Sequence, residues 1–489
     1  MKNDKFLEYL LTDKEWQIFE CKRALAQPKK MLESIVALAN SDGGLVVVGL
    51  EDPEKATGKA RLCGISEGLD NVSEIQNLVH KEIVPPIKGT KTLELDIINI
   101  KGKPDKLFLL FIDPQADIHS IKSGKTFVRR GRHNRALTAQ EIIHLKYAKG
   151  AITYESEVVK GVSIDDLDRT IINKFKGHVG SSQGDNLELF VNNGLAERSK
   201  ERCHLNNAAV LLFAKNPSIL LKRKCGIKIT HYFGKKADFS GEPNFIRRPF
   251  SIEGSLIEQI QQTFNYIKNW IESSPPKLEG AGFKSKLKYP LWVIQEAIAN
   301  AVIHRDYSLQ NDIQVRIFDN RIEIESPGIL PGNITISNIR QDRFARNPII
   351  LRTLNRFGDE SPNLDIGEGV DRMFDLMKVA NLYDPLYLVS PFTNNSVLVV
   401  LFNMERISYW DTVSQYLDKF RRITNKELRK ITGIKDSVKA SRLLKTWVKN
   451  KLLEEVKPSK KNTFYRRHGE TTLPDLLSPP GENKKTLEA

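Results

Sequence analysis

The chain is 489 residues long, with 40% hydrophobic and 28% charged residues, which is the composition of a globular protein. Because one hydrophobic core rarely supports a chain of this length, we expect about three domains. The four cysteines are widely spaced and include no C-x-x-C pair, so they predict neither a disulfide framework nor a zinc site. The N-terminus has no apolar signal core, and no apolar run is long enough to span a membrane. We therefore expect a cytoplasmic protein that does not bind membranes.

The formal net charge is +15, and much of it lies near the C-terminus. Residues 406–468 hold eighteen Lys and Arg against six Asp and Glu, a net charge of +12. Such a concentration is typical of a module that binds phosphate backbones. A solvated face that only confers solubility has the same composition, so the charge by itself leaves both interpretations open.

The first 150 residues alternate helical and strand patterns, which predicts an α+β domain. An amphipathic segment over 31–40, a turn over 41–44 and an apolar run over 45–50 indicate a helix, a tight turn and a buried strand. Further strands are expected over 93–100, 106–112 and 125–130. A helix over 138–148 closes the unit, with Thr138 as N-cap and Glu141 completing a capping box.

Acidic side chains and a lysine lie close together in this part of the sequence. In a short strand, Glu20 and Lys22 share one face, and Cys21 points to the opposite side. If Glu15, Glu20 and Asp52 converge, their oxygens would bind Mg²⁺ or Mn²⁺, and Lys22 would orient a water for phosphodiester cleavage. The alternative is an exposed ion pair between Glu20 and Lys22, with Asp52 capping a turn.

Three segments resemble the Schlafen AlbA-type domain over about residues 10–148: E-x-x-x-x-E-x-K at 15–22, ALANSDGGLVVVGLED at 37–52 and KTFVRRGRHNRALTAQEI at 125–142. The resemblance implies that Glu15, Glu20 and Asp52 correspond to the metal site of nuclease-active members. Many bacterial relatives carry the domain with only an assumed DNA-binding role, so nuclease activity stays open. The cations Arg129, Arg130, Arg132 and Arg135 surround Gly131 and suit phosphate contacts, or else form a solvated basic loop.

The central part of the chain predicts a sheet covered by helices. A polar stretch over 177–186 reads as a loop or linker, and apolar segments follow at 208–214 and 226–233. We expect helices over 252–271, 290–304 and 370–380, a hairpin of strands 312–319 and 321–326, and a strand over 396–402.

In the helix over 290–304, Glu296, Asn300 and His304 recur every four residues and therefore share one stripe. A carboxylate and a carboxamide one turn apart suit a water-activating base and a Mg²⁺ ligand beside a triphosphate. A polar surface stripe is the alternative. Gly367 and Gly369 open the next helix, where unpaired N–H groups favour a phosphate.

An ordered set of segments resembles the GHKL ATP-binding fold of bacterial proteins called RecG-like, over about residues 150–403: EAIANAVIHRDY at 296–307, ESPGILP at 325–331, RNPII at 346–350 and GEGVDRMF at 367–374. The resemblance implies ATP as ligand, Glu296 as general base and Asn300 as Mg²⁺ ligand. It also implies that the nucleotide is contacted by His304, Gly328, Arg346, Asn347, Gly367 and Gly369. Residues 325–329 depart from the D-x-G-x-G motif that reads adenine, which puts adenine specificity and hydrolysis in doubt. The chain has no Walker P-loop, so the helicase label carries no helicase function.

The basic C-terminal stretch predicts a winged helix-turn-helix. Helices over 425–432 and 437–450 flank Gly433, and two wing strands follow over 452–456 and 463–467. The second helix would enter the major groove and contact nucleic acid through Lys439, Arg442 and Lys445, and the wing would add Lys460 and Lys461. Winged helices also mediate dimerisation or other protein contacts, which is the alternative.

We therefore expect an α+β multidomain fold. Its parts are a Schlafen AlbA-like domain over 1–150, a GHKL α/β sandwich with an N-terminal extension over 151–403, a winged helix over 404–468 and a disordered tail over 469–489. DNA or RNA, including tRNA, is the expected partner, and both families imply a homo-oligomer. One hypothesis is a metal-dependent nuclease gated by ATP, with slow ATPase activity, in phage defence or a stress response. The other is an ATP-responsive DNA-binding regulator without nuclease activity.

Overall fold

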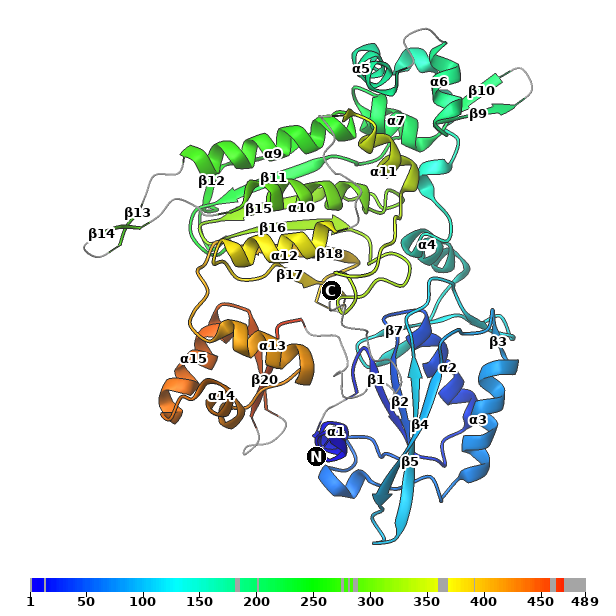
Figure 1. Cartoon of the computed structure of the whole chain (residues 1–489). Coiled ribbons are helices and arrows are strands. Elements are labelled where there is room, and N and C mark those ends of the chain that lie inside the picture. Colours follow the sequence, from blue (N-terminus) through cyan, green and yellow to red (C-terminus); the bar gives the residue numbers. More distant parts are fainter. Residues whose placement is uncertain are drawn as a thin grey trace, which may run out of the picture. The chain divides into compact units, whose positions relative to one another are not determined.

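The computed structural model describes residues 2–12, 15–180, 185–199, 202–273, 277–279, 282–284, 289–358, 368–390, 392–457 and 463–469. Contacts divide the chain into two compact units, drawn in Figure 1. The first unit holds residues 1–143, 335–337 and 407–489, and the second holds 144–334 and 338–406. Each unit has its own sheets and its own buried core.

A four-stranded mixed sheet forms the centre of the first unit. Its order is β1 (Phe19–Lys22), β2 (Gly44–Val48), β5 (Pro104–Ile112) and β4 (Lys91–Ile98), with β1 parallel to β2 and the other neighbours antiparallel. Val46 and Val48 belong to the core that contains α2 (Pro28–Ala39) and α3 (Leu69–Lys81). Leu45 and Val47 belong to the opposite core, with α1 (Lys2–Thr12). Because β2 is buried on both faces, its sequence is an uninterrupted apolar run.

The predicted helix, tight turn and buried strand are confirmed. Helix α2 begins earlier than expected because Pro28 fits its first turn. Gly43 in the turn has φ +71°, and a Cβ there would lie 2.5 Å from the carbonyl oxygen of Ile112, so only glycine fits. Short elements complete this part: the 3₁₀ helix η1 (Gly58–Arg61) and strands β3 (Ile83–Val84) and β6 (Ser120–Ile121).

A hairpin and a helix follow the sheet. Strands β7 (Phe127–Arg130) and β8 (His133–Ala136) are antiparallel, and α4 (Ala139–Lys149) comes next, with its first residues in the first unit and its last in the second. The predicted capping box is confirmed. The Thr138 N–H donates to Glu141 Oε2 at 3.0 Å, and the Glu141 N–H donates to Thr138 Oγ1 at 3.3 Å.

Three helices and a two-stranded hairpin form the C-terminal part of the first unit. They are α13 (Trp410–Phe420), α14 (Asn425–Thr432), α15 (Ser437–Lys449), β19 (Leu453–Val456) and β20 (Phe464–Arg467). The expected order of elements after residue 424 is confirmed, and α14 ends at Gly433 with φ +73°. On α15, Trp447 and Leu444 are buried, whereas Val438 is 57% exposed. Because Trp447 packs on Trp410, with ring centroids 5.3 Å apart, it sets the buried face of α15.

Small helices and a hairpin begin the second unit. They are η2 (Tyr154–Ser156), η3 (Ile164–Asp166), α5 (Arg169–Val179), α6 (Asn186–Asn192), β9 (Ala196–Ser199), β10 (Arg202–Leu205), α7 (Asn207–Phe213) and α8 (Pro217–Leu220). Phe213 packs on Phe175, on Phe190 and on Phe357, which follows α11 (Pro348–Asn355), and Phe175 also packs on Phe357. The polar stretch expected as a linker contains the end of α5, and its residues 181–184 lie outside the described residues.

Glu155 is a fully buried carboxylate at the N-terminus of α11. Its two oxygens accept the N–H groups of Ile349 and Ile350 at 2.8 Å each. Burial raises the pKa of Glu155 to about 7, against the lowering effect of the two N–H groups. The carboxylate thus joins the segment before α5 to the start of α11.

We expect stability to depend on pH through Glu155. Because its pKa is raised from 4.5 to about 7 on folding, the protonated side chain is favoured in the folded state. The free energy of unfolding should fall by up to about 3 kcal/mol between pH 4.5 and pH 7 and stay level above that. Urea unfolding of wild type and Glu155→Gln at several pH values measures this. The variant should lose most of the slope, whereas the exposed control Asp165→Asn should keep it; equal slopes in all three proteins would contradict the assignment.

A six-stranded sheet forms the centre of the second unit. Its order is β12 (Phe245–Ile252), β11 (Ile227–Tyr232), β15 (Ile313–Phe318), β16 (Arg321–Pro327), β18 (Ser396–Phe402) and β17 (Leu386–Leu388), with only the β11–β15 pair parallel. Helices α9 (Leu256–Ser273), α10 (Leu291–Ile303) and α12 (Gly369–Val379) lie side by side over the sheet in Figure 1. The short hairpin of β13 (Lys277–Glu279) and β14 (Gly282–Lys284) precedes α10. The expected sandwich of helices on a sheet is confirmed.

The predicted hairpin is also confirmed, and the alternate residues Ile313, Val315 and Ile317 of β15 are all buried. The expected helix over 252–271 starts too early. Ile252 pairs with Ile227 as the last residue of β12, and Gly254 has φ +116°. Helix α9 begins only after Ser255, whose hydroxyl donates to Glu258 Oε2 at 2.8 Å.

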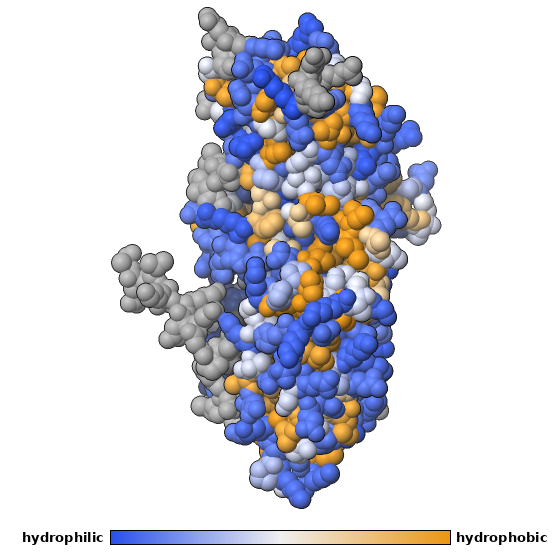
Figure 2. Space-filling model, turned by 90° about the vertical axis from the view of Figure 1, so that its right-hand side faces the viewer, coloured by the Kyte–Doolittle hydropathy of each residue, from blue (hydrophilic) through white to orange (hydrophobic). Residues whose placement is uncertain are grey.

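The surface seen in Figure 2 is mainly hydrophilic, with apolar patches between the polar side chains. Apolar surface of this kind is normal for globular proteins. Among the described residues, no helix combines the length and the apolar composition that crossing a membrane requires.

Candidate nucleotide pocket and nucleic-acid-binding surfaces

A cavity of about 340 Å³ lies between α10, the start of α12 and the sheet of the second unit. Glu296 and Asn300 of α10 and His304, which caps the end of this helix, all line it, as the predicted stripe requires. Gly328 and Gly369 line it from the loop after β16 and from α12. The opposite stripe of α10 is divided: Ile294 and Ile298 are buried in the core, but Ala297 and Ala301 are small enough to form part of the cavity wall.

Glu296 and Asn300 form a pair inside this cavity. The Asn300 side-chain N–H donates to Glu296 Oε1 at 3.0 Å. Burial raises the pKa of Glu296, and the hydrogen bond from Asn300 and the charge of Arg372 act in the opposite direction. A buried carboxylate with a raised pKa is suited to accept a proton from water near neutral pH.

Gly369 allows the start of α12 to approach Glu296. A Cβ on Gly369 would lie 1.8 Å from Glu296 Oε1, so any larger residue would displace the carboxylate. Gly369 is the first residue of an eleven-residue helix, and Glu368 before it makes no side-chain cap. Among the described residues, the first N–H groups of this helix have no backbone partner, and Gly369 and Val370 line the same cavity as Glu296. Gly367, the other predicted phosphate contact, lies outside the described residues.

In the segment that stands in place of the adenine-reading motif, Glu325 lies outside the cavity and Ser326 lies in its wall. Glu325 lies outside the cavity lining and binds Arg316 at 2.7 Å and the Ser396 hydroxyl at 2.6 Å. Ser326 lines the cavity, and its hydroxyl donates to the carbonyl of Ala301 at 2.7 Å. The hydroxyl oxygen of Ser326 therefore offers only acceptor capacity to a ligand. Glu325 does not substitute for the missing aspartate.

Gly328 and His304, two predicted nucleotide contacts, both line the cavity. Gly328 has φ +110°, and a Cβ there would lie 2.7 Å from the Cβ of Asp306. The pKa of His304 is lowered to about 4, by burial first and by Arg346 second, so the imidazole is neutral at neutral pH. A neutral imidazole in the cavity wall provides a ring for stacking and a nitrogen for hydrogen bonding.

The expectation that Arg346 and Asn347 contact the nucleotide is wrong, because both are buried outside the cavity lining. Arg346 donates to the carbonyls of His304 and Ala148 at 2.7 and 2.8 Å, and also to that of Ile329. The Asn347 amide donates to the carbonyls of Ile303 and Arg305 at 2.7 and 2.8 Å. These side chains fix the backbone around the cavity, because they satisfy carbonyls that α10 leaves unpaired at its end.

The residues present fit a Mg²⁺ ion bound together with a triphosphate. Mg²⁺ usually takes one or two protein oxygens plus phosphate oxygens and waters. The side-chain N–H of Asn300 is held by Glu296, so its carbonyl oxygen is the group left to serve as ligand. When bound, the ion would neutralise phosphate charge.

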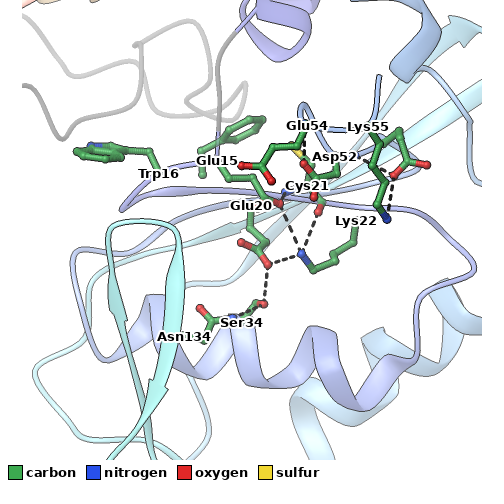
Figure 3. A network of polar contacts seen from close by, with 12 residues as sticks. Glu15, Trp16, Glu20, Cys21, Lys22, Ser34, Asp52, Glu54, Lys55 and Asn134 are labelled. Atoms are coloured by element: carbon green, nitrogen blue, oxygen red, sulfur yellow. Dashed lines mark hydrogen bonds and ion pairs between the residues drawn. The ribbon is translucent and has the colours of Figure 1, made fainter. Parts of the chain in front are cut away.

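A second cluster, in the first unit, contains the acidic residues predicted near the N-terminus, and Figure 3 shows it. Lys22 Nζ lies 2.6 Å from Glu20 Oε1 and 3.5 Å from Glu15 Oε1. Glu15 also accepts the Cys21 N–H at 3.0 Å, and Ser34 donates to Glu20 at 3.0 Å. Burial raises the pKa of Glu15, and the charge of Glu20 adds to this effect. As expected, Cys21 faces the core on the opposite side of β1.

Glu20 is a buried structural partner of Arg129. Its Oε2 lies 2.6 Å from an Arg129 guanidinium nitrogen, and the two side chains are 3% and 0% exposed. Arg129 also donates to the carbonyls of Trp16 and Phe19 and to Asn134 Oδ1. The expectation that Arg129 contacts phosphate is therefore wrong. Arg130 and Arg132 of the same hairpin are exposed, although Arg132 forms an ion pair with Glu54.

The acidic cluster does not fit a metal site of three carboxylates. Glu20 already faces two cations, Lys22 and Arg129. Asp52 Oδ1 accepts the Glu54 N–H at 2.8 Å, as a turn-capping residue does. Within the described ranges, no group of three His, Cys, Asp or Glu side chains is placed to hold a metal ion. The prediction that Glu15, Glu20 and Asp52 converge on Mg²⁺ or Mn²⁺ finds no support in this geometry.

The C-terminal helix α15 presents the basic face that its sequence predicts. Lys439, Arg442 and Lys445 are exposed, and in the part of the chain that the structure describes none of them forms an ion pair. Asp436 caps α15 by accepting the Val438 N–H at 2.7 Å. The wing residues Lys460 and Lys461 lie outside the described residues. That this module is a winged helix stays a prediction.

Comparison with protein families decides the identity of two parts. Residues 15–138 match the family "Schlafen, AlbA_2", and residues 310–401 match the family "Putative ATP-dependent DNA helicase recG C-terminal". The chain contains a Schlafen AlbA_2 domain and a RecG-type C-terminal domain. Both predicted resemblances are thereby confirmed, and these domains indicate nucleotide and nucleic-acid binding.

The match to the RecG-type domain starts after α10, so Glu296 and Asn300 lie outside the matched residues, whereas Gly328 and Gly369 lie within them. The chain also aligns with the crystal structure of the DIP2311 protein from Corynebacterium diphtheriae, at 18% sequence identity and a TM-score of 0.40. The alignment covers 95% of this chain and 96% of the DIP2311 chain. The comparison with curated proteins finds no match.

Arg372, Trp292 and Tyr387 also line the pocket and were not anticipated. Arg372 lies over the ring of Trp292 at 4.6 Å, and both line the cavity. Tyr387 of β17 also lines it. Arg372 follows Gly369 by three residues, which is the one sequence signal that would have indicated it, because residues three apart share a helix face. Tyr387 gives no such signal, since β17 reaches the pocket only through sheet pairing.

Proposed function

We propose that this protein is an ATP-responsive nucleic-acid-binding protein. ATP binds in the cavity of the second unit, and nucleic acid binds to the basic face of α15 and to Arg130 and Arg132. The observation that carries the proposal is the approach of Gly369 to the Glu296–Asn300 pair. One cavity thus combines a carboxylate, a carboxamide and the free N–H groups of a helix end.

Phosphate and metal binding follow from these three groups. The N–H groups at the start of α12 suit the phosphates, and the Asn300 carbonyl oxygen suits the Mg²⁺ that accompanies them. Glu296 would accept a proton from the attacking water if hydrolysis occurs. Ser326 offers an acceptor where the family has an aspartate, so the base selectivity needs its own measurement with ATP and GTP.

Nucleic-acid binding rests on the cations of α15. A face with three exposed cations that have no acidic partner in the described residues attracts the phosphate backbone. The first residues of a recognition helix are the ones that reach base edges in the major groove, and in α15 these include Lys439 and Arg442. In this proposal, ATP binding regulates the binding of nucleic acid.

The cleavage hypothesis remains a prediction with weaker geometric support, because the charge of Glu20 is balanced by Arg129 and Lys22. Glu15 and Asp52 are the acids left for a cleavage reaction on DNA or RNA, including tRNA. A role in phage defence or a stress response, dimer or higher assembly and a cytoplasmic location remain predictions as well.

The deciding experiment measures the affinity of the full chain for a labelled DNA duplex by fluorescence anisotropy, with and without ATP and Mg²⁺. We expect the affinity to change with ATP in the wild type. Gly369→Ala should weaken ATP binding at least about tenfold, because it displaces Glu296. Lys439→Ala/Arg442→Ala should weaken duplex binding and lower the salt slope by about 2.

Gly177→Ala is the matched control, because a Cβ at this helix position meets no neighbouring atom. Equal duplex affinity with and without ATP would overturn the regulatory proposal. Cleavage of any of the nucleic acids in the presence of Mn²⁺, lost in Asp52→Asn, would restore the nuclease hypothesis.

A further inference from the structure

The loop between β11 and β12 carries exposed aromatic and basic side chains together. Phe233 is 70% exposed and Phe239 is 64% exposed. Lys235 and Lys236 of the same loop and Arg248 of β12 are also exposed, and no ion pair to any of the three occurs in the described ranges. Aromatic rings together with cations on an exposed loop are typical of a contact surface.

The side chain of Asn244 braces the loop through hydrogen bonds at both of its polar atoms. The Asn244 amide donates to the carbonyls of Phe233 and Lys236 at 2.5 and 2.8 Å. Its oxygen accepts the Asp238 N–H at 2.8 Å. A loop fixed in this way presents its side chains with little loss of conformational entropy on binding.

An aromatic cluster supports the exposed ring of Phe239. The ring lies edge-on to Tyr232, with centroids 6.3 Å apart. Tyr232 in turn stacks on Phe318 at 4.8 Å with an interplanar angle of 5°. Next to the loop, Arg247 of β12 lies 4.3 Å above the Phe250 ring. The outer ring therefore stands on a rigid base at the edge of the six-stranded sheet, because β12 is an outer strand.

We propose that this loop and β12 bind a single-stranded nucleic acid. Bases stack on Phe233 and Phe239, and phosphates contact Lys235, Lys236 and Arg248. Stacking requires unpaired bases, which a duplex does not offer, and cations without acidic partners favour a polyanion over an apolar protein surface. This site is separate from the basic face of α15, so it adds a second class of nucleic acid to the proposed function.

The test measures binding of a fluorescein-labelled oligothymidylate, longer than the about 4–16 nucleotides that such sites cover, to the full chain. Phe233→Ala/Phe239→Ala should weaken this binding about tenfold or more and leave duplex affinity unchanged. Lys235→Ala/Lys236→Ala should weaken it and lower the salt slope by about 1.4. The lysine variant keeps the test decisive if the phenylalanine variant folds poorly.

Ile219→Ala is the matched control, because Ile219 is 68% exposed in the same unit. It should bind the oligonucleotide as the wild type does. Absence of single-strand binding by the wild type, or equal affinity in all variants, would overturn the inference. A change of oligomeric state in the phenylalanine variant with unchanged oligonucleotide affinity would also overturn it, and would make the loop a contact between copies. Duplex binding through α15 and ATP binding are measured separately, so their failure is distinguishable.

Discussion

Replacing Arg129 by methionine should destabilise the AlbA_2 domain by about 3–5 kcal/mol. Arg129 is the buried partner of Glu20, and its remaining N–H groups are taken up by the carbonyls of Trp16 and Phe19 and by Asn134. Its removal leaves Glu20 buried with Lys22 as its neighbouring cation, and leaves the two carbonyls with only the backbone N–H groups of Phe19 and Trp16 as donors. Hydrogen exchange of the amides in β1 and β7 measures the effect, and protection should fall at least about a hundredfold.

Arg130→Met is the control, because Arg130 is the next residue in the same strand and is exposed. It should leave protection within about twofold of the wild type, since surface substitutions usually change stability by at most about 0.5 kcal/mol. Equal protection in the two variants would show that the buried ion pair does not hold the hairpin of β7 and β8 to β1.

The same ion pair affects how the cleavage hypothesis is tested. A Glu20→Ala variant would leave Arg129 buried without its carboxylate, so loss of activity there would report on folding. Asp52 is the better probe, because its side chain accepts an N–H in an exposed turn. Asp52→Asn keeps the shape and the acceptor oxygen and removes only the charge.

Glu296→Gln should lower phosphate release from ATP by about 10²–10⁴-fold if the protein hydrolyses ATP, and ATP binding should persist. Glutamine keeps an oxygen for the Asn300 amide but cannot take a proton from water. Burial raises the pKa of Glu296. The wild-type rate should therefore rise with pH through that raised value, because only the ionised carboxylate is a base.

Glu325→Gln is the control for this measurement, because Glu325 is an acid of the neighbouring strand outside the cavity, with Arg316 and Ser396 as partners. It should retain the wild-type rate. A wild-type protein that binds ATP but releases no phosphate above the Glu296→Gln background would make the pocket a sensor without turnover.

The sequence by itself determined the local elements and the two domain families. Periodicity and end signals are local, so the helix–turn–strand unit ending at β2, the hairpin of β15 and β16 and the cap of α4 could be located without a structure. The stripe of Glu296, Asn300 and His304 was equally visible, because one helix places residues four apart on one face.

Only the tertiary structure decided which side chains meet across elements. Glu20 and Arg129 lie far apart in sequence, and their pairing follows from the packing of the β7–β8 hairpin against α2 and from the hydrogen bond of Arg129 to the Phe19 carbonyl of β1. Nothing local indicates that Arg129 is buried while Arg130 is exposed. Likewise, Arg346 and Asn347 bind backbone carbonyls because α10 ends beside them. Whether a side chain is buried depends on the neighbours that the fold supplies. Because a buried charge or carbonyl without a partner is costly, Arg129, Arg346 and Asn347 bind groups of the protein and not the ligands expected from the sequence.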